Sequence, residues 1–390
     1  MGTRQPRSIP RHSEDTPTRL RLKPLPEQVI VITGASSGIG LATARRAVRG
    51  GASVFLISRN GECLARRCAE LERMGGRAAY AAADVGDESQ LRAAAASALA
   101  RFGRIDTWVN VAGVGIYAPL LATPPAEHER LFRTNYWGVV NASIVAMPHL
   151  RGGAFISVAS VVADFGAPLL GAYSASKHAM KGYVDSLRIE TFADRIPTAI
   201  TLVKPSGIAT PFAEHAATHL PHAARTPPPA YAPELVATAI LFAAEHPRRE
   251  ITVGGVGAFE ILGARILPRL ADRISAWYRP YLIDRRHLPS ATNNLFAPGQ
   301  GGERHSRAHA LERSVYSDIV LHGGPAARLA VLGLAAIGLT LLARSSTRWR
   351  TLGDRAAGMR HALPAGTWNR TGNQPGPAAR GTCAARSPPA

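Results

Sequence analysis

The sequence predicts a doubly wound α/β domain over residues 28–262, built on a parallel sheet, with a helical, partly disordered C-terminal extension. Short runs of continuous apolar residues recur along this segment, and an amphipathic helical stretch separates each run from the next. Strands that are apolar on both faces are typical of parallel sheets covered by helices on both sides. A glycine-rich turn directly after the first run is the third observation, because ligands bind at the carboxyl ends of such strands.

The predicted elements alternate strictly along the chain. The apolar runs predict strands at 28–33, 53–58, 77–84, 105–111, 154–158, 198–203 and 250–253. The stretches between them predict helices at 41–49, from after 58 to 74, 88–102, a long helix that ends near 149, 172–192 and 233–245. Strands joined through helices indicate parallel neighbours in one sheet.

The flanking segments have a different composition. Residues 1–27 contain five prolines and no periodic apolar pattern, which predicts a disordered basic arm. Apolar residues at helical spacing predict an amphipathic extension over 263–288, and the polar, Gly-rich stretch 289–325 predicts a linker. Residues 345–390 are rich in Arg, Pro and Gly, which predicts a disordered basic tail.

An uncharged apolar run lies within residues 326–344 and extends from Leu329 to Ala343. A helix that spans a bilayer needs about 20 apolar residues, so this run is short for a full span. Three interpretations stay open: a packed helix, a tilted or interfacial membrane helix, and a contact between copies of the chain.

The net charge of +19 is distributed unevenly. Residues 28–262 hold 22 Lys or Arg and 18 Asp or Glu, so most of the excess lies in the terminal segments. A nucleic-acid-binding fold carries its basic stripe on the folded domain, and the sequence therefore predicts no nucleic-acid partner. Two interpretations of the basic tails stay open: an Arg-rich composition without function, and attraction to an anionic membrane surface.

The chain contains only three cysteines, at positions 63, 68 and 383, and no Cys/His cluster with metal-ligand spacing. The first 20 residues lack the apolar stretch of a secretory signal. These observations predict a reducing, cytoplasmic location, peripheral to or anchored at a membrane if 326–344 makes that contact. They also predict that no metal is bound.

The turn TGASSGIG, residues 33–40, joins the first predicted strand to its helix. A phosphate approaches a helix N-terminus closely only where the turn lacks Cβ atoms, and glycines supply that. The turn has no Lys of the kind that nucleoside-triphosphate loops carry, which favours a dinucleotide over ATP. The residues predicted to bind it are Gly34, Ser36, Ser37, Gly38, Ile39 and Gly40.

Arg59 follows the second predicted strand directly. An NAD-type site places an acid near this strand end to bind the ribose 2′-hydroxyl, and here no acid precedes Glu62. A guanidinium at this position suits a 2′-phosphate, so the sequence predicts NADP(H) in preference to NAD(H). The alternative for Arg59 is a solvated residue that caps a helix.

Ser160, Tyr173 and Lys177 form the third pattern. Tyr173 and Lys177 are four residues apart on a predicted helix and therefore lie on one face of it. An ammonium near a phenol favours the phenolate and lowers its pKa, which suits general acid/base catalysis. Ser160 follows the fifth strand, so its hydroxyl is expected at the carboxyl edge of the sheet.

Together with the segment from Asn110 to Gly113, Asn135 and YSASK at 173–177, these motifs resemble the classical short-chain dehydrogenase/reductase family in order and spacing. The resemblance covers about 235 residues and implies a Rossmann fold with hydride transfer between nicotinamide and a carbonyl or alcohol carbon. It departs from the family's usual pattern at Val111, Ala159 and Ser206. These departures concern the cofactor loops and leave the proton-relay residues in place.

The resemblance implies a role for each matching residue. Tyr173 is the general acid/base, Ser160 orients the carbonyl oxygen, and Lys177 binds the nicotinamide ribose and lowers the pKa of Tyr173. Asn135 holds a water that links Lys177 to solvent. The remaining implied cofactor contacts are Asp84 to the adenine amino group, Asn110, Ala112 and Gly113 along the cofactor, and Thr210 to the carboxamide.

These expectations combine into an NADP(H)-dependent oxidoreductase for a small carbonyl or alcohol substrate, with a hydrophobic ketone or aldehyde favoured. The resemblance also implies a homodimer or homotetramer formed through helices around 127–149 and 172–192. The alternative is a catalytically silent NADP-binding sensor or scaffold, attached to a membrane in one version. The histidines at 215, 219 and 222 fall in the segment that forms the substrate lid in this family, and we expect no metal there.

Overall fold

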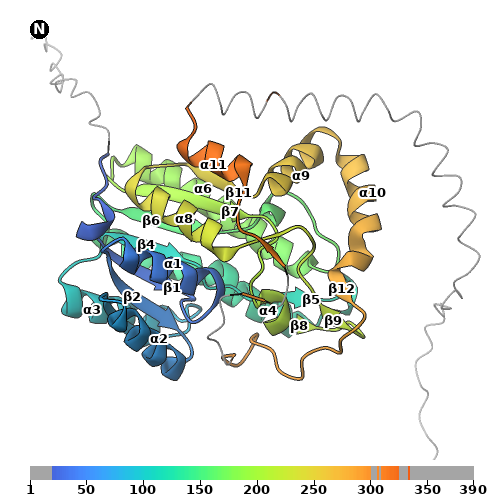
Figure 1. The fold of residues 1–390 in the computed structure, drawn as a ribbon, viewed down its shortest axis with the longest axis horizontal. Coiled ribbons are helices and arrows are strands. Elements are labelled where there is room, and N and C mark those ends of the chain that lie inside the picture. The colour runs from blue at the N-terminus through green and yellow to red at the C-terminus, as the bar shows by residue number, and fades with distance from the viewer. Residues whose placement is uncertain (1–19, 300–304, 307–308, 325–332, 334–390) are drawn as a thin grey trace, which may run out of the picture. The chain divides into compact units, whose positions relative to one another are not determined.

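The computed structural model describes residues 20–299, 305–306, 309–324 and 333 of the 390. Its centre is a parallel sheet of seven strands with helices on both faces, as the apolar runs predict (Figure 1). The strands are β1 (Val29–Thr33), β2 (Ser53–Ser58), β3 (Arg77–Ala82), β4 (Thr107–Asn110), β6 (Ala154–Val158), β7 (Ala199–Pro205) and β11 (Glu250–Val253).

The strand order places a switch point beside β1. The order across the sheet is β11-β7-β6-β4-β1-β2-β3, so the chain first moves to one side of β1 and then returns to its other side at β4. Connections that leave neighbouring strands in opposite directions open a crevice at the carboxyl ends of those strands. The glycine-rich turn after β1 and the loop after β4 therefore meet at this crevice.

Helices bury their apolar faces on the two sides of the sheet. Buried residues of α1 (Gly38–Arg49), α2 (Gly61–Arg73) and α8 (Pro233–Glu245) form one core cluster with the sheet. Those of α3 (Glu88–Phe102), α5 (Gly138–Ala146) and α6 (Gly171–Ala193) form a second cluster on the other face. Each apolar strand is thus buried on both faces, which explains its lack of alternation.

The long helix predicted to end near His149 is interrupted. The chain forms α4 (Pro125–Phe132), a π-helical turn at Arg133–Trp137, and then α5. A π-helical turn inserts an extra residue into the helix and is frequent at functional sites. The apolar periodicity continues through the interruption, so it carries no signal for the turn.

Residues 20–27 do not belong to a disordered arm, contrary to the prediction. The side chains of Leu20, Leu22 and Leu25 pack against the core cluster on the face of α1 and α8. Lys23 forms a 2.6 Å ion pair with Asp106. Three leucines at short spacing hold this segment in place despite its prolines, and residues 1–19 lie outside the described part of the chain.

The region after β7 forms small paired elements over the carboxyl edge of the sheet. Short strands pair in three two-stranded sheets: β5 (Ile116–Tyr117) with β8 (Ala217–Thr218), β9 (Ala223–Ala224) with β12 (Ile283–Asp284), and β10 (Ala230–Tyr231) with β13 (Ala310–Leu311). The short helix α7 (Phe212–His215) lies between β7 and β8 in the chain. Segments far apart in the sequence thus hold one another in place.

The predicted amphipathic extension is helical, in α9 (Gly255–Ile266) and α10 (Pro268–Tyr278). The predicted linker 289–325 is not a simple connection. Its residues 294–299 contact the loop after β2 and Arg130 of α4, and α11 (Val315–His322) packs near α8 and β11. Leu295 and Leu321 are both buried, which the polar composition of the linker does not indicate.

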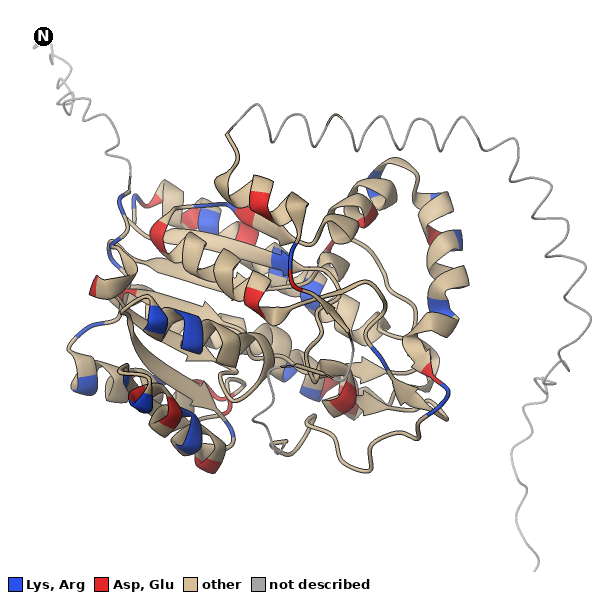
Figure 2. Cartoon of the chain, viewed as in Figure 1, with Lys and Arg blue, Asp and Glu red and all other residues tan. Residues whose placement is uncertain are grey.

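The apolar segment 326–344 lies outside the described residues, apart from position 333. Among the residues that the structure does describe, no helix is long and apolar enough to cross a membrane. Lys and Arg alternate with Asp and Glu over the ribbon of the domain (Figure 2).

Candidate active site

The glycine-rich turn is held tightly against the loop after β4. The hydroxyl of Thr33, at the end of β1, accepts hydrogen bonds from the backbone N–H groups of Val111 and Ala112 at 3.1 and 3.3 Å. Gly34 has φ +67°, and a Cβ there would lie 2.7 Å from the backbone of Ala112. A side chain at Gly34 would thus be strained in its backbone and would collide with the neighbouring loop.

The turn and the loop line one pocket at the carboxyl edge of the sheet. The predicted cofactor residues found in its wall are Gly34, Ser36, Ser37, Gly38, Ile39, Gly40, Arg59, Asp84, Ala112, Gly113 and Thr210. Residues that the sequence did not predict also line it, among them Ser58, Val111, Thr134, Phe212, Asn294, Pro298 and Gly299. The last three lie in the predicted linker, where no pattern marks them as site residues.

Asn110 does not line this pocket, contrary to the implied role. Its side chain is buried in the sheet, where Oδ1 accepts a hydrogen bond from the indole N–H of Trp108 and Nδ2 donates to the hydroxyl of Ser157. Asn110 is the last residue of β4, and its side chain points to the sheet's second face. It therefore stabilises the strand end that carries the cofactor loop.

The pocket fits a dinucleotide. The start of α1 presents its backbone N–H groups beside Gly34, Gly38 and Gly40, which carry no Cβ, and this suits a pyrophosphate. Three buried side-chain oxygens in the pocket wall have no hydrogen-bond partner: Ser58 Oγ, Thr134 Oγ1 and Asn294 Oδ1. Buried polar atoms without partners are rare, and a polar ligand in this pocket would satisfy them.

The part of the pocket near Arg59 and Asp84 is strongly polar. Asp84 accepts a 2.6 Å hydrogen bond from the guanidinium of Arg130 and another from the backbone N–H of Gly86. Arg59 donates to three backbone carbonyls, those of Asn294, Leu295 and Phe296. Burial and the neighbouring Arg130 lower the pKa of Arg59, while Asp84 opposes this.

The predicted catalytic residues converge next to this pocket. Tyr173 contacts the ring of Phe212, a pocket residue, at 5.2 Å between centroids. The side chain of Ser160 lies close enough to the Tyr173 phenol to lower its pKa, and the ammonium of Lys177 lies 5.6 Å from the centre of the Tyr173 ring. A Cβ at Gly113 would lie 3.7 Å from Lys177 Nζ, so Lys177 reaches the pocket wall.

Lys177 is buried, and its Nζ donates a 3.0 Å hydrogen bond to the carbonyl of Val158 at the end of β6. Burial lowers the pKa of Lys177 to about 7. Desolvation acts against the charged ammonium, and the described residues place no carboxylate close enough to compensate for it.

The pKa of Tyr173 does not follow the simple expectation. Burial raises it above the ordinary value of 10, and the hydrogen bond with Ser160 lowers it by a smaller amount. Lys177 was expected to lower this pKa, but its own charge is reduced by burial and it lies over the ring. The protein alone therefore favours a neutral phenol, which is the form that donates a proton.

Asn135 lies in the π-helical turn and is fully buried. Its Nδ2 donates to the carbonyl of Val114 and the hydroxyl of Ser176, both at 3.0 Å, and its Oδ1 accepts from the N–H of Val114 at 2.9 Å. Both amide N–H groups are thus used within the protein. The side chain fixes the loop after β4 against α6 and offers no free N–H to the water that the resemblance implies.

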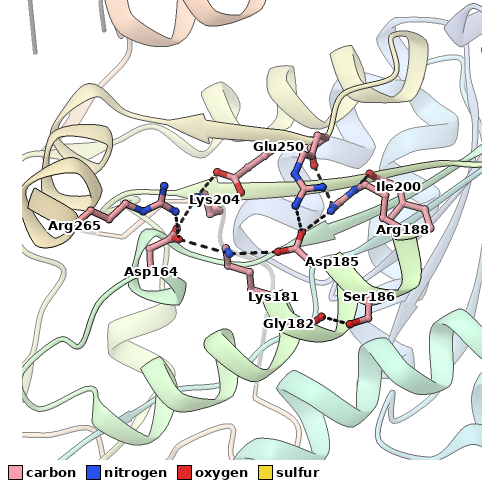
Figure 3. Close-up of polar contacts among 11 residues, drawn as sticks. Asp164, Lys181, Gly182, Asp185, Ser186, Arg188, Ile200, Lys204, Glu250 and Arg265 are labelled. Carbon is pink, nitrogen blue, oxygen red and sulfur yellow. Dashed lines mark hydrogen bonds and ion pairs between the residues drawn. The ribbon is translucent and has the colours of Figure 1, made fainter. Parts of the chain in front are cut away.

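A network of charged side chains lies behind the turn that follows Ser160. Figure 3 shows it between α6, β7, β11 and α9. Asp164 pairs with Lys204 at 2.5 Å, with Arg265 at 3.1 Å and with Lys181 at 3.8 Å. Lys204 also pairs with Glu250, and it is only 1% exposed. These pairs fix the turn that presents Ser160 to the site.

The histidines of the lid segment do not gather around a metal. His219 pairs with Glu127 at 2.9 Å, on a different element. Within the part of the chain that the structure describes, no group of three or more His, Cys, Asp or Glu side chains is arranged to hold a metal ion.

Comparison with known proteins identifies the family. Residues 28–220 match the family model of the short chain dehydrogenases. The uncharacterized oxidoreductase YxnA of Bacillus subtilis is 39% identical over 325 residues, which cover 78% of this chain and 91% of that protein. The chain belongs to the short-chain dehydrogenase family.

Solved structures have the same fold. A short chain dehydrogenase/reductase from Burkholderia phymatum in complex with NAD superposes with a TM-score of 0.56 at 24% identity, covering 62% of this chain and 94% of that one. An alcohol dehydrogenase from Thermococcus sibiricus complexed with 5-hydroxy-NADP gives 0.52 at 25% identity, covering 58% and 95%. The family places this protein among oxidoreductases that act on CH–OH and C=O groups with a nicotinamide cofactor.

Proposed function

We propose that the protein reduces a hydrophobic ketone or aldehyde with NADPH and that Tyr173 supplies the proton. The observation that carries the proposal is the convergence of Tyr173, Ser160 and Lys177 beside a pocket built around the glycine-rich turn. The bound nicotinamide would supply the hydride. The protein's own residues supply orientation and the proton.

Ser160 and Tyr173 act together on the carbonyl oxygen. Their side chains lie close together, so a substrate oxygen that accepts a hydrogen bond from both hydroxyls would be held in one position. Burial keeps Tyr173 neutral, and a neutral phenol donates its proton to the oxygen as negative charge develops there. Tyr173 and Ser160 are therefore assigned as the proton donor and the orienting residue.

Lys177 and Asn135 support this pair. Lys177 carries an N–H group to the pocket wall near Gly113, which suits a ribose hydroxyl of the nicotinamide half, and it returns the proton to Tyr173. With a pKa of about 7, Lys177 both accepts and donates protons at neutral pH. Asn135 acts as a positioning residue, because it ties the loop of Val114 to Ser176 one residue before Lys177.

NADP(H) is the preferred cofactor in this proposal. Arg59 directly follows β2 and lines the pocket, and no carboxylate occupies its place at the strand end. Asp84, the nearest acid of the pocket, follows β3 and pairs with Arg130. A guanidinium here gives a 2′-phosphate a charged hydrogen-bond partner that a ribose hydroxyl does not need.

The lining of the lid supports an apolar substrate. Leu169, Leu170 and Leu220 belong to one buried apolar cluster, and Phe212 and Tyr173 both pack against it. Small apolar ketones would lose water-exposed surface in this cluster, whereas sugars would leave their hydroxyls without partners.

A turnover panel tests the proposal. Absorbance at 340 nm is followed with NADPH or NADH, against cyclic and aromatic ketones, aliphatic aldehydes and polar sugars. The proposal predicts a higher kcat/KM with NADPH and with the lipophilic carbonyls. Saturation by small polar sugars without turnover of lipophilic ketones would contradict the substrate class. Binding of NADPH without turnover of any carbonyl would favour the sensor alternative.

We also propose that two copies associate through α5 and α6. These helices expose large apolar side chains: Trp137 and Ile144 at the α5 end, and Ile189 and Phe192 on α6, with exposures from 47% to 87%. Exposed apolar residues of this size on adjacent helices favour a contact between copies. Light scattering behind a sizing column should give a dimer or tetramer mass, and Phe192→Asp should shift it toward the monomer.

A cytoplasmic location completes the proposal. Cys63 and Cys68 are both buried free thiols, which suits a reducing compartment. Fractionation of cells tests it: the protein is expected with the cytoplasmic fraction, and recovery only from the membrane pellet after a salt wash would favour anchoring through 326–344.

A further inference from the structure

A segment of the chain beyond the family match lies across the adenosine end of the cofactor pocket. Residues 293–299, which we name the strap, follow the amphipathic extension, whereas the family model ends at residue 220. Asn294, Pro298 and Gly299 of the strap line the same pocket as the glycine-rich turn. The strap therefore adds a wall that the α/β domain by itself does not provide.

The strap is anchored at both of its ends and in its middle. The N–H of Asn294 donates to the carbonyl of His215 at 2.9 Å, and Asn60 Nδ2 donates to the carbonyl of Gly299 at 3.1 Å. Between them, the side chain of Leu295 is 1% exposed and packs in a cluster with Val114, Ile116 and Leu131. Polar contacts and one buried leucine thus hold the strap over the pocket.

The guanidinium of Arg59 is the main polar partner of the strap. Its Nη1 donates to the carbonyls of Leu295 and Phe296 at 3.3 Å each, and its Nη2 donates to the carbonyl of Asn294. Arg130 adds a 2.9 Å hydrogen bond to the carbonyl of Leu295. Three carbonyl oxygens therefore face the group that we assign to the 2′-phosphate.

A 2′-phosphate and these carbonyls compete for the same N–H groups of Arg59. Nη1 and Nη2 both already donate to strap carbonyls, so a phosphate bound end-on across these two nitrogens would have to displace the strap, and only the Nε–H and the second N–H of Nη2 stay available while the strap is closed. A phosphate dianion placed there would also face the negative ends of three carbonyl dipoles. A ribose 2′-hydroxyl carries no charge and needs none of these donors.

We infer that the strap weakens the binding of NADP(H) relative to NAD(H): it competes with the 2′-phosphate for Arg59 and must leave Arg59 for the 2′-phosphate to bind there, whereas NAD(H) binds with the strap closed. This inference rests on the proposed function. Closure by the strap raises the apparent dissociation constant of NADP(H) by the inverse of the open fraction. The strap thus reduces the preference for NADP(H) over NAD(H) that Arg59 alone would give.

The test uses two ligands that differ only in the 2′-phosphate. 2′,5′-ADP and 5′-AMP are titrated by calorimetry into the full chain, its Leu295→Ala variant, and the matched control Phe296→Ala. Phe296 lies next to Leu295 in the strap but is 60% exposed, so its side chain anchors the strap far less than the buried Leu295 does. Loss of the Leu295 anchor should tighten 2′,5′-ADP about tenfold if the strap is open in about a tenth of the molecules. The affinity for 5′-AMP should stay within about twofold, and Phe296→Ala should match the wild type.

Hydrogen exchange on the wild-type protein gives a second readout that needs no variant. 2′,5′-ADP should speed exchange of the backbone amides in 293–299, and 5′-AMP should not. Slower exchange of these amides with 2′,5′-ADP, or equal changes in both affinities in Leu295→Ala, would overturn the inference while leaving the proposed function intact. Absence of binding by NADPH, NADH and both half-ligands would instead overturn the proposed function.

Discussion

Replacing Asp164 by Asn removes the buried negative charge on which Lys204, Lys181 and Arg265 converge. The side chain of Asp164 is 4% exposed and that of Lys204 is 1% exposed, so water cannot replace the lost charge. Breaking a buried ion pair costs about 3–5 kcal/mol of folding free energy. Lys204 keeps Glu250 as a partner, which places the expected loss near the lower end, at about 3 kcal/mol.

The assay is urea unfolding at pH 7, with thermal melting beside it. A loss of about 3 kcal/mol corresponds to a melting temperature lower by about 6–12 °C in a domain of this size. The control is Arg265→Ala, because Arg265 is 62% exposed and its ion pair should contribute under about 1 kcal/mol. An Asp164→Asn loss no larger than that of Arg265→Ala would refute the reasoning.

The pH dependence of the loss is a further check. Burial raises the pKa of Asp164, but the hydrogen bond and charge of Lys204, with Lys181 and Arg265, outweigh burial and hold the pKa below the ordinary 3.8. A carboxyl with a lowered folded-state pKa stabilises the fold above its unfolded-state pKa and loses that contribution as pH falls through the folded-state value. Wild type and Asp164→Asn should therefore converge below pH 3.8. A gap that persists unchanged into strong acid would mean that the charge is not the cause.

Two further predictions concern the cofactor turn and the buried lysine. Gly34→Ala should weaken NADPH binding and lower the stability of the fold, because φ is +67° and the added Cβ would lie 2.7 Å from the backbone of Ala112. The control is Gly75→Ala, where φ is +84° but no atom lies within 4 Å of the added Cβ. This control should lose about 1–2 kcal/mol of stability through backbone strain and leave the Kd for NADPH unchanged. Fluorescence titration compares the two, and equal effects on binding would contradict the close-approach argument. Lys177→Met should gain stability relative to wild type as pH falls from 10.5 to about 7, because the unfolded chain binds a proton over that range and the folded protein does not. Urea unfolding at pH 7 and 9 measures this, and a difference that does not change with pH would count against the lowered pKa.

The sheet and most of its helices could be predicted from the sequence because their signals are local. β2 (53–58), β6 (154–158) and α8 (233–245) begin and end where the apolar runs and helical patterns predict. The requirement for glycine in the turn after β1 could also be predicted, and the structure shows it at Gly34, which has a positive φ and lies against the backbone of Ala112.

The features that were missed depend on contacts between distant segments. Leu22 and Leu25 pack against the core, and nothing in the proline-rich sequence around them indicates a partner more than 200 residues away, such as Glu245, which accepts a hydrogen bond from the N–H of Leu25. Leu295 was missed for the same reason, because its polar neighbours in the sequence give no indication that its side chain is buried over the pocket. Composition describes a segment by itself and carries no information about the surface that it meets.

Side-chain roles were predictable only in part. The spacing of Tyr173 and Lys177 correctly placed them together, but the pKa of Tyr173 depends on burial, which no spacing reveals. Asn110 was expected at the cofactor and instead bonds Trp108 and Ser157, because the face on which a strand's last residue points depends on register.

The central claim is that Tyr173 donates the proton beside a cofactor held by the glycine-rich turn. The most direct test titrates NADPH into the wild-type protein and Tyr173→Phe by fluorescence and then measures turnover of a lipophilic ketone with both. Our account predicts similar Kd values for NADPH and a turnover lower by about 10²–10⁴ in Tyr173→Phe, because only the proton donor is removed. Turnover by Tyr173→Phe at the wild-type rate would contradict it.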